Sequence, residues 1–300
     1  MKGYIGSVRF FKNLILLTVI IAILVPSVLA VRYRRQSAQL EQQLEKLEDH
    51  NALLLDGVSR LTAETLAAGE AIPYQEMFPD FYAPEYVGTE TGNGKTAFLT
   101  FDDGPSDRTD EILDVLKATE TKATFFVVGN TEEDALNRMK RIAEEGHTLG
   151  MHSYSHDYKD IYSSVEAYLE DMYRLFALIQ ETTGQTPTVF RMPGGSLNAY
   201  NYDIYQELLA EMLRRGFLPC DWNLSAGDVE GVLLTEEEIV SNVISGASLM
   251  ERCFVLMHDD DDNAATVEAL EQIIQELNQQ GFALEALKPD TTPVLFGYRK

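Results

Sequence analysis

The sequence predicts an α/β protein in which parallel strands form a distorted (β/α)7-type barrel. From residue 95 onward, short apolar runs alternate with longer segments of helical periodicity. Strict alternation implies parallel strands joined by right-handed crossovers, and a doubly wound open sheet is the alternative arrangement. Glycines stand where four of the helices should end: Gly146, Gly184, Gly216 and Gly281. In both architectures, catalytic and ligand-binding residues lie at the carboxyl ends of the strands.

The expected elements fill a domain from residue 95 to residue 290, followed by a tail at 291–300. Strands are expected where apolar runs of about five residues occur. These runs are 96–101, 123–128, 147–151, 188–191, 217–220, 254–257 and 282–287. Helices are expected between them at 108–119, 132–145, 164–182, 202–215, 235–250 and 264–280.

The N-terminal region has the pattern of a membrane anchor. Residues 14–31 are eighteen uncharged, mostly apolar residues, and three basic residues flank them on each side. This length and these flanks predict a transmembrane helix at 13–31. The two flanks are equally basic and do not settle its orientation, and the expected arrangement has residues 1–12 in the cytoplasm and the domain outside the cell membrane. The alternative is a secretory signal cleaved after Ala30, which would release the protein.

A helical spacer is expected between the anchor and the domain, over residues 36–68. Four leucines recur every seven residues, at Leu40, Leu47, Leu54 and Leu61. This repeat is typical of a short coiled coil that would pair two copies of the chain through residues 40–65, and a single amphipathic helix is the alternative. Residues 69–94 contain three prolines among several aromatic residues and are expected to form a linker.

The charge and the cysteines limit the classes of function. The net charge is −24, but residues 1–35 carry +6, which leaves −30 on the rest. Such an acidic body excludes nucleic acid as a partner. The two cysteines, Cys220 and Cys253, form no C-x-x-C pair, so a thiolate metal site is not expected. Buried free thiols are expected, with a disulfide as the alternative in an exported protein.

Two adjacent carboxylates, Asp102 and Asp103, end the first apolar strand in the stretch "TAFLTFDDGP". Like charges at the end of a buried strand are unfavourable unless a cation offsets them. The stretch "HSYSH" places His152 and His156 after another strand, at the same edge of the sheet. Two histidines and one carboxylate suit a divalent ion with positions left open for water. A second carboxylate beside such an ion is a candidate general base.

A third histidine, His258, ends the strand 254–257 at the same edge. From the residues alone it is a metal ligand, a general acid or a structural residue. The acidic run 259–262 that follows is expected to be a solvated loop.

In their order along residues 95–288, these motifs resemble those of the polysaccharide deacetylases of carbohydrate esterase family 4. The resemblance implies a distorted barrel of fewer than eight strands. It makes Asp102 the catalytic base and Asp103, His152 and His156 the metal ligands. "RMPGG" resembles the family's third motif, which implies that Arg191 pairs with the base and orients it.

The remaining motifs are matched with two departures. "SAGDV" offers Asp228 to tune the acid, but Val229 replaces the usual tryptophan. "LMH" implies that Leu256 lines the acetyl pocket and that His258 is the acid. Gly194 replaces an aromatic residue whose backbone N–H helps to hold the oxyanion, and glycine still supplies that donor. Trp222 is a candidate for part of the missing aromatic wall, with a core position as the alternative.

The resemblance implies a metal-dependent hydrolase that removes acetyl groups from an N-acetylated cell-wall glycan. Peptidoglycan N-acetylglucosamine is the expected substrate. Zinc is the expected metal, with cobalt or another transition metal as alternatives. The aromatic residues missing at Gly194 and Val229 motivate a second hypothesis, a membrane-anchored protein of the same fold that binds glycan or acts as a scaffold without strong catalysis.

Overall fold

The computed structural model describes residues 72–85, 94–229 and 234–296. Its centre is one sheet in which every described pairing is parallel. The strands are β1 (Thr96–Asp102), β2 (Thr124–Val128), β3 (Thr148–Ser153), β4 (Val189–Phe190), β5 (Leu218–Pro219), β6 (Leu224–Ser225), β7 (Arg252–His258) and β8 (Ala283–Leu284).

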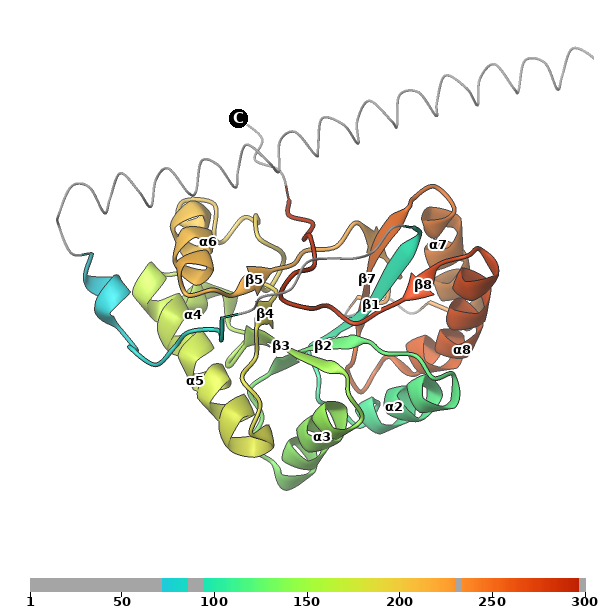
Figure 1. The fold of residues 1–300 in the computed structure, drawn as a ribbon, viewed down its shortest axis with the longest axis horizontal. Helices are drawn as coiled ribbons and strands as arrows, with labels where there is room; N and C mark the ends of the chain where they lie inside the picture. Colours follow the sequence, from blue (N-terminus) through green and yellow to red (C-terminus); the bar gives the residue numbers. More distant parts are fainter. Residues whose placement is uncertain (1–71, 86–93, 230–233, 297–300) are drawn as a thin grey trace, which may run out of the picture. The chain divides into compact units, whose positions relative to one another are not determined.

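The sheet is curled and open (Figure 1). The strand order is β5-β4-β3-β2-β1-β7-β6, and β8 pairs with the first two residues of β1. In the described residues the two end strands, β5 and β6, pair only with β4 and β7. The parallel α/β class is therefore confirmed, but the expected barrel is a half-barrel of eight strands. β6 was missed because its two residues are too short for a periodic signal.

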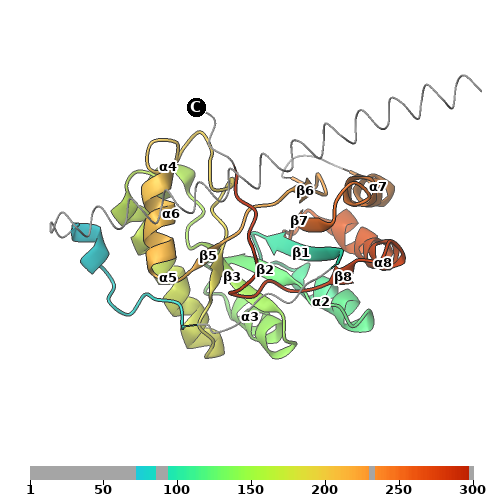
Figure 2. The same cartoon turned by 45° about the horizontal axis from the view of Figure 1, so that its top comes forward.

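Helices cover the outer side of this sheet (Figures 1 and 2). They are α2 (Thr109–Ala118), α3 (Glu133–Glu144), α4 (Tyr158–Ile161), α5 (Val165–Thr183), α6 (Tyr205–Arg214), α7 (Glu236–Ala247) and α8 (Ala264–Gln279). Six of them match the predicted helices to within three residues at each end. The seventh, α4, is a single turn that the Asp157 side chain caps by accepting from the backbone N–H groups of Lys159 and Asp160.

The central strands are buried on both faces, so their sequences are continuous apolar runs rather than alternating ones. Successive side chains point to opposite faces of a strand. Leu99 and Phe101 of β1 pack in the large core between sheet and helices, whereas Phe98 belongs to a smaller cluster with Phe126 and Phe254. By the same alternation, Asp102 points to the inner side of the curl, above this smaller cluster.

Residues before β1 pack against the helices. A short 3-10 helix, η1 (Pro73–Glu76), leads to Phe81, which is fully buried against Phe176 and Phe217. Arg215 is also buried, and its guanidinium donates to the carbonyl oxygens of Tyr74, Met77, Phe78 and Phe81. The described part of the expected linker is therefore fixed to α5 and α6.

Cys220 and Cys253 are both buried and free, which confirms the expectation of unpaired thiols. The predictions for residues 1–12, 13–31, 36–68 and 40–65, with cleavage after Ala30, lie outside the described residues. Among the helices that the structure describes, none combines the length and the apolar character needed to cross a bilayer.

Candidate active site

Asp102, at the carboxyl end of β1, forms a buried ion pair with Arg191. Arg191 Nη1 donates to Asp102 Oδ1 at 2.7 Å, and both side chains are almost fully buried. Further donors of the guanidinium bind Thr100 Oγ1 and the carbonyl oxygens of Cys220 and Asp221, and the group lies 4.3 Å from the centroid of the Phe126 ring. A buried charge is tolerated when it is paired and hydrogen-bonded in this way. The pair therefore holds the Asp102 carboxylate in one orientation.

Asp103, the neighbouring carboxylate, converges with two histidines. Asp103 Oδ1 lies 3.2 Å from His156 Nε2 and 3.4 Å from His152 Nε2. One ligand atom from each of the three residues lies within 4.8 Å of the others. Among the described residues Asp103 Oδ1 is buried and has no hydrogen-bond partner. A buried carboxylate oxygen without a donor is unfavourable, so this cluster fits a cation.

The protonation of the two histidines favours this use. His152 Nδ1 lies 2.8 Å from the Arg191 carbonyl oxygen, and since a carbonyl only accepts, that nitrogen carries the proton. Its Nε2 is therefore the ring atom that faces Asp103 and is available as a metal ligand. Burial, and then the neighbouring His152, lower the pKa of His156, which keeps that ring neutral. Two neutral imidazoles and one carboxylate are a donor set for zinc, cobalt or a similar ion.

Two of these three residues have strained backbones. Asp103 has φ 74° and His156 has φ 55°, both in the left-handed region that non-glycine residues rarely adopt. The surrounding backbone holds Asp103 in place, because its N–H donates to the Phe126 carbonyl at 3.2 Å and Val128 N–H donates to the Gly104 carbonyl at 2.8 Å. Strain that the fold maintains at converging polar side chains is typical of a functional site.

His258, at the end of β7, faces the same site beside Asp102, since the two residues are direct neighbours in the β1–β7 register. Asp228 Oδ1 lies 3.1 Å from His258 Nδ1, and Asp228 Oδ2 accepts from the His258 N–H and from Thr266 Oγ1. Burial alone would lower the pKa of His258, but the hydrogen bond and charge of Asp228, aided by Asp102 and Asp103, raise it to about 9. The ring is therefore protonated at neutral pH.

The remaining predicted residues lie on three segments: Gly194 in the loop after β4, Trp222 between β5 and β6, and Leu256 on β7. Gly194 is exposed with φ 75°, and its N–H donates to no residue that the structure describes. Leu256 is buried two residues before His258, so both side chains lie on the same face of β7. Trp222 is half-buried against the Phe296 ring, with ring centroids 4.7 Å apart, and it lies 5.7 Å from the Arg191 guanidinium. Trp222 is therefore neither a fully buried core residue nor a fully exposed aromatic wall, because it packs on Phe296 and stays partly accessible.

Known proteins share this sequence pattern. A family model described as polysaccharide deacetylase matches residues 89–213. A peptidoglycan-N-acetylglucosamine deacetylase of Bacillus cereus is 33% identical over 196 residues, which span 64% of this chain and 69% of the relative. The chain belongs to the polysaccharide deacetylase family. Members of this family are hydrolases that act on the amide bonds of N-acetylated glycans, and they are generally metal-dependent.

Solved structures share the fold of this polysaccharide deacetylase. The catalytic domain of a peptidoglycan N-acetylglucosamine deacetylase from Eubacterium rectale matches with a TM-score of 0.67 at 36% identity, over 72% of this chain and 98% of that one. A polysaccharide deacetylase from Bacillus cereus matches with a TM-score of 0.60 at 32% identity, over 67% and 97%.

Three buried aspartates that sequence reasoning missed hold the loops of the deacetylase site. Asp171 of α5 accepts from Ser153 Oγ and from the N–H groups of Tyr154 and Ser155, which lie between His152 and His156 in the sequence. Asp259 accepts from Ser106 Oγ and Thr109 Oγ1, in the loop after Asp103. Asp221 accepts from the N–H groups of Ser196 and Phe296, in the loop after Arg191.

No sequence signal marks these residues, because their partners are 16 or more positions away. The run 259–262 was expected to be a solvated loop, but Asp259 is only 1% exposed, so the expectation is wrong for this residue. The described part of the expected tail, residues 291–296, includes the Phe296 N–H that Asp221 binds.

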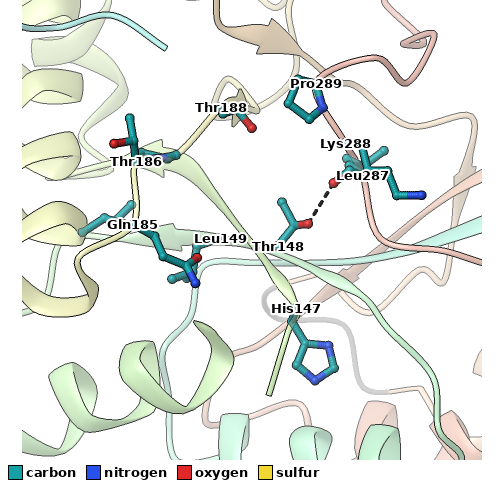
Figure 3. A pocket seen from close by; sticks show the side chains of 11 residues that line it. His147, Thr148, Leu149, Gln185, Thr186, Thr188, Leu287, Lys288 and Pro289 are labelled. Carbon is teal, nitrogen blue, oxygen red and sulfur yellow. Dashed lines mark hydrogen bonds between the residues drawn. The ribbon is translucent and has the colours of Figure 1, made fainter. Parts of the chain in front are cut away.

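A cavity of about 210 Å³ lies elsewhere in the deacetylase, at the amino ends of β3 and β4 (Figure 3). Thr148, Thr186 and Leu287 are among the residues that line it, and Figure 3 shows the His147 ring turned away from them. Burial, and then Lys122, lower the pKa of His147 to about 4, while its Nδ1 accepts from the Ala123 N–H. His147 is therefore a neutral structural residue at the end of β3 opposite the site.

Proposed function

We propose that this chain is a metal-dependent N-deacetylase that acts on the N-acetylglucosamine of peptidoglycan. The observation that carries the proposal is the convergence of three potential ligands, Asp103, His152 and His156, beside the buried Asp102–Arg191 pair. His258, protonated through Asp228, completes the set from the neighbouring strand. The similar proteins of Bacillus cereus and Eubacterium rectale are both named as peptidoglycan N-acetylglucosamine deacetylases, which supports this choice of glycan.

The roles of the side chains follow from their chemistry. A divalent ion held by Asp103, His152 and His156 supplies Lewis-acid activation when it is bound, and zinc or cobalt suits this donor set. Asp102 accepts the proton of the attacking water, and Arg191 holds its carboxylate in one orientation. The water oxygen forms a bond to the acetyl carbon, and the amide C–N bond breaks to leave acetate and an amine.

Three further groups serve the same reaction. The Gly194 N–H donates to the oxyanion as negative charge develops on the amide oxygen. His258 gives its proton to the departing nitrogen, which leaves as a neutral amine. Leu256 supplies an apolar contact for the acetyl methyl group. In the cell, residues 13–31 would anchor the enzyme at the membrane with the domain outside, where it reaches the cell wall.

The experiment is acetate release from purified peptidoglycan by the full-length protein. Acetate release is expected with added zinc or cobalt, and it should stop after chelation and return when the metal is restored. The matched control is the Asp102→Asn protein under the same conditions. A folded, metal-loaded protein that binds glycan but releases no acetate would overturn the proposal in favour of the glycan-binding hypothesis.

The pH dependence tests the role of His258. Without a metal ion the pKa is raised to about 9 from an ordinary value of 6.5, and a bound ion offsets the part contributed by Asp102 and Asp103, so the rate of the metal-loaded enzyme is expected to fall between pH 6.5 and about 9. The ion pair with Asp228 stabilises the fold fully below about pH 6.5, and this contribution is lost as the pH rises through about 9.

Asp228→Asn removes the charge while keeping an acceptor oxygen, so the basic limb of the pH–kcat profile should move toward 6.5. A metal ion at Asp103 offsets the two site carboxylates, which leaves Asp228 as the group that sets the limb. An unchanged basic limb in the variant would contradict the assignment of His258 as the acid.

A further inference from the structure

Gly194 occupies the position of the aromatic residue in the family's third motif, and a side chain there would meet the side chains of Tyr158 and Asn198. The backbone at Gly194 has φ 75°, which is strained for any residue with a Cβ atom. A Cβ at this position would lie 2.9 Å from Tyr158 Cε1 and 3.2 Å from Asn198 Nδ2. The volume beside Gly194 is therefore already filled, and the ring that fills it is that of Tyr158.

Tyr158 lies between this loop and the metal-site histidines. It begins α4, two residues after His156, and the two rings meet edge to face with centroids 5.3 Å apart and an interplanar angle of 89°. Tyr200 packs on it as well, with centroids 5.2 Å apart. Tyr158 is half-buried and Tyr200 is 54% exposed, so together they form an aromatic surface that opens to solvent next to the reacting groups.

The surroundings hold this surface in place. The Asp157 side chain caps the turn that carries Tyr158. On the opposite side, the Tyr162 hydroxyl donates to the Pro193 carbonyl at 2.7 Å, and Asn198 Nδ2 donates to the same oxygen at 3.0 Å. Among the described residues, none accepts a hydrogen bond from the Tyr158 hydroxyl. A fixed ring with an unused hydroxyl is suited to binding a ligand that is apolar on one face and polar at its rim.

We propose that Tyr158, extended by Tyr200, is the wall against which the sugar ring of the substrate stacks, in place of an aromatic side chain at position 194. A pyranose ring presents axial C–H bonds to the aromatic face and hydroxyl groups at its edge, where the Tyr158 hydroxyl can bond to them. This inference rests on the proposed function, since it takes an N-acetylated sugar as the ligand. It makes Tyr158 a specificity-determining residue, while the proton transfers remain with Asp102 and His258.

The test compares kinetic and binding constants of Tyr158 variants. The probe is the tetramer of N-acetylglucosamine, and acetate release gives kcat and KM for the zinc-loaded full-length protein. For Tyr158→Ala, KM is expected to rise about tenfold while kcat stays within about threefold, which is the scale of one lost aromatic stacking contact. Tyr158→Phe keeps the ring and should recover most of the loss.

Two controls separate stacking from a structural role. Tyr202 is 53% exposed in the same loop as Tyr200, and Tyr202→Ala should leave KM unchanged. Zinc affinity, measured by calorimetry, should stay within about threefold in Tyr158→Ala. If zinc affinity and kcat fall together while KM does not change, Tyr158 merely supports His156 and the inference is wrong.

The same probe distinguishes this inference from the proposed function. Calorimetry measures binding of the tetramer to Asp102→Asn protein with and without Tyr158→Ala. About tenfold weaker binding supports the inference, even if the wild-type protein releases no acetate and the proposed function fails. Equal binding by the two proteins overturns the inference, and so does an absence of binding to the Asp102→Asn protein at millimolar tetramer.

Discussion

Asp102→Asn is expected to lower kcat for acetate release by about a thousandfold, the scale of a lost general base. Its metal affinity should stay within about threefold of the wild-type value, because Asp103, His152 and His156 are unchanged. An amide cannot take a proton from water, although it still fills the same volume beside Arg191. The buried guanidinium keeps its hydrogen bonds to Thr100 and two carbonyl groups, so the variant should fold.

The measurement is single-turnover acetate release at saturating zinc, with zinc affinity measured on the same preparation. Asp203→Asn provides a control, because Asp203 is an exposed aspartate outside the site and should retain full activity. If Asp102→Asn keeps more than about a tenth of the wild-type rate, another group accepts the proton and the assignment of the base is wrong.

Asp103→Ala is expected to abolish metal binding and acetate release together. The side chain supplies the only carboxylate among the three converging ligands, and without it two neutral imidazoles remain. We expect zinc affinity to fall by more than about a hundredfold, since even the loss of a residue that only supports a ligand costs 10- to 100-fold. His152→Ala should behave in the same way.

Thermal denaturation with and without zinc identifies the cause of the loss. A metal that binds only the folded state stabilises it by about 2.7 kcal/mol at a concentration 100 times its Kd. The wild-type protein and Asp102→Asn should show this increase, whereas Asp103→Ala should not. In chelator, the midpoint of each protein gives the baseline against which its own zinc-dependent increase is measured. Zinc stabilisation that survives in Asp103→Ala would contradict the proposed ligand set.

Part of this site could be predicted because its signals are local. The two aspartates end a continuous apolar run, and His152 and His156 are separated by four residues, so strand boundaries alone place them at one edge. The resemblance of the ordered motifs to those of the family then predicted that Arg191 pairs with Asp102. In the structure, Arg191 Nη1 lies 2.7 Å from Asp102 Oδ1. These residues could be found without knowing how the loops pack.

The rest depends on contacts between distant residues. Asp259 accepts hydrogen bonds from Ser106 and Thr109, which are 153 and 150 positions away in the sequence. Its neighbours in the sequence are acidic, and they indicated a solvated loop instead. Tyr158 fills the space beside Gly194 from a different loop, which the local pattern of either segment does not reveal. Likewise, β6 and α4 have only two and four residues, and tertiary contacts rather than periodicity define them.

The hydrogen bond from Phe296 N–H to Asp221 links the loop that carries Gly194 to the end of the domain. Asp221 holds Ser196 in the loop that carries Gly194, and the same carboxylate accepts from the backbone N–H 75 residues further on. A ribosome must therefore synthesise almost the whole domain before this loop acquires its last partner. The loop that carries Gly194 is thus completed by Phe296, one of the last residues that the structure describes.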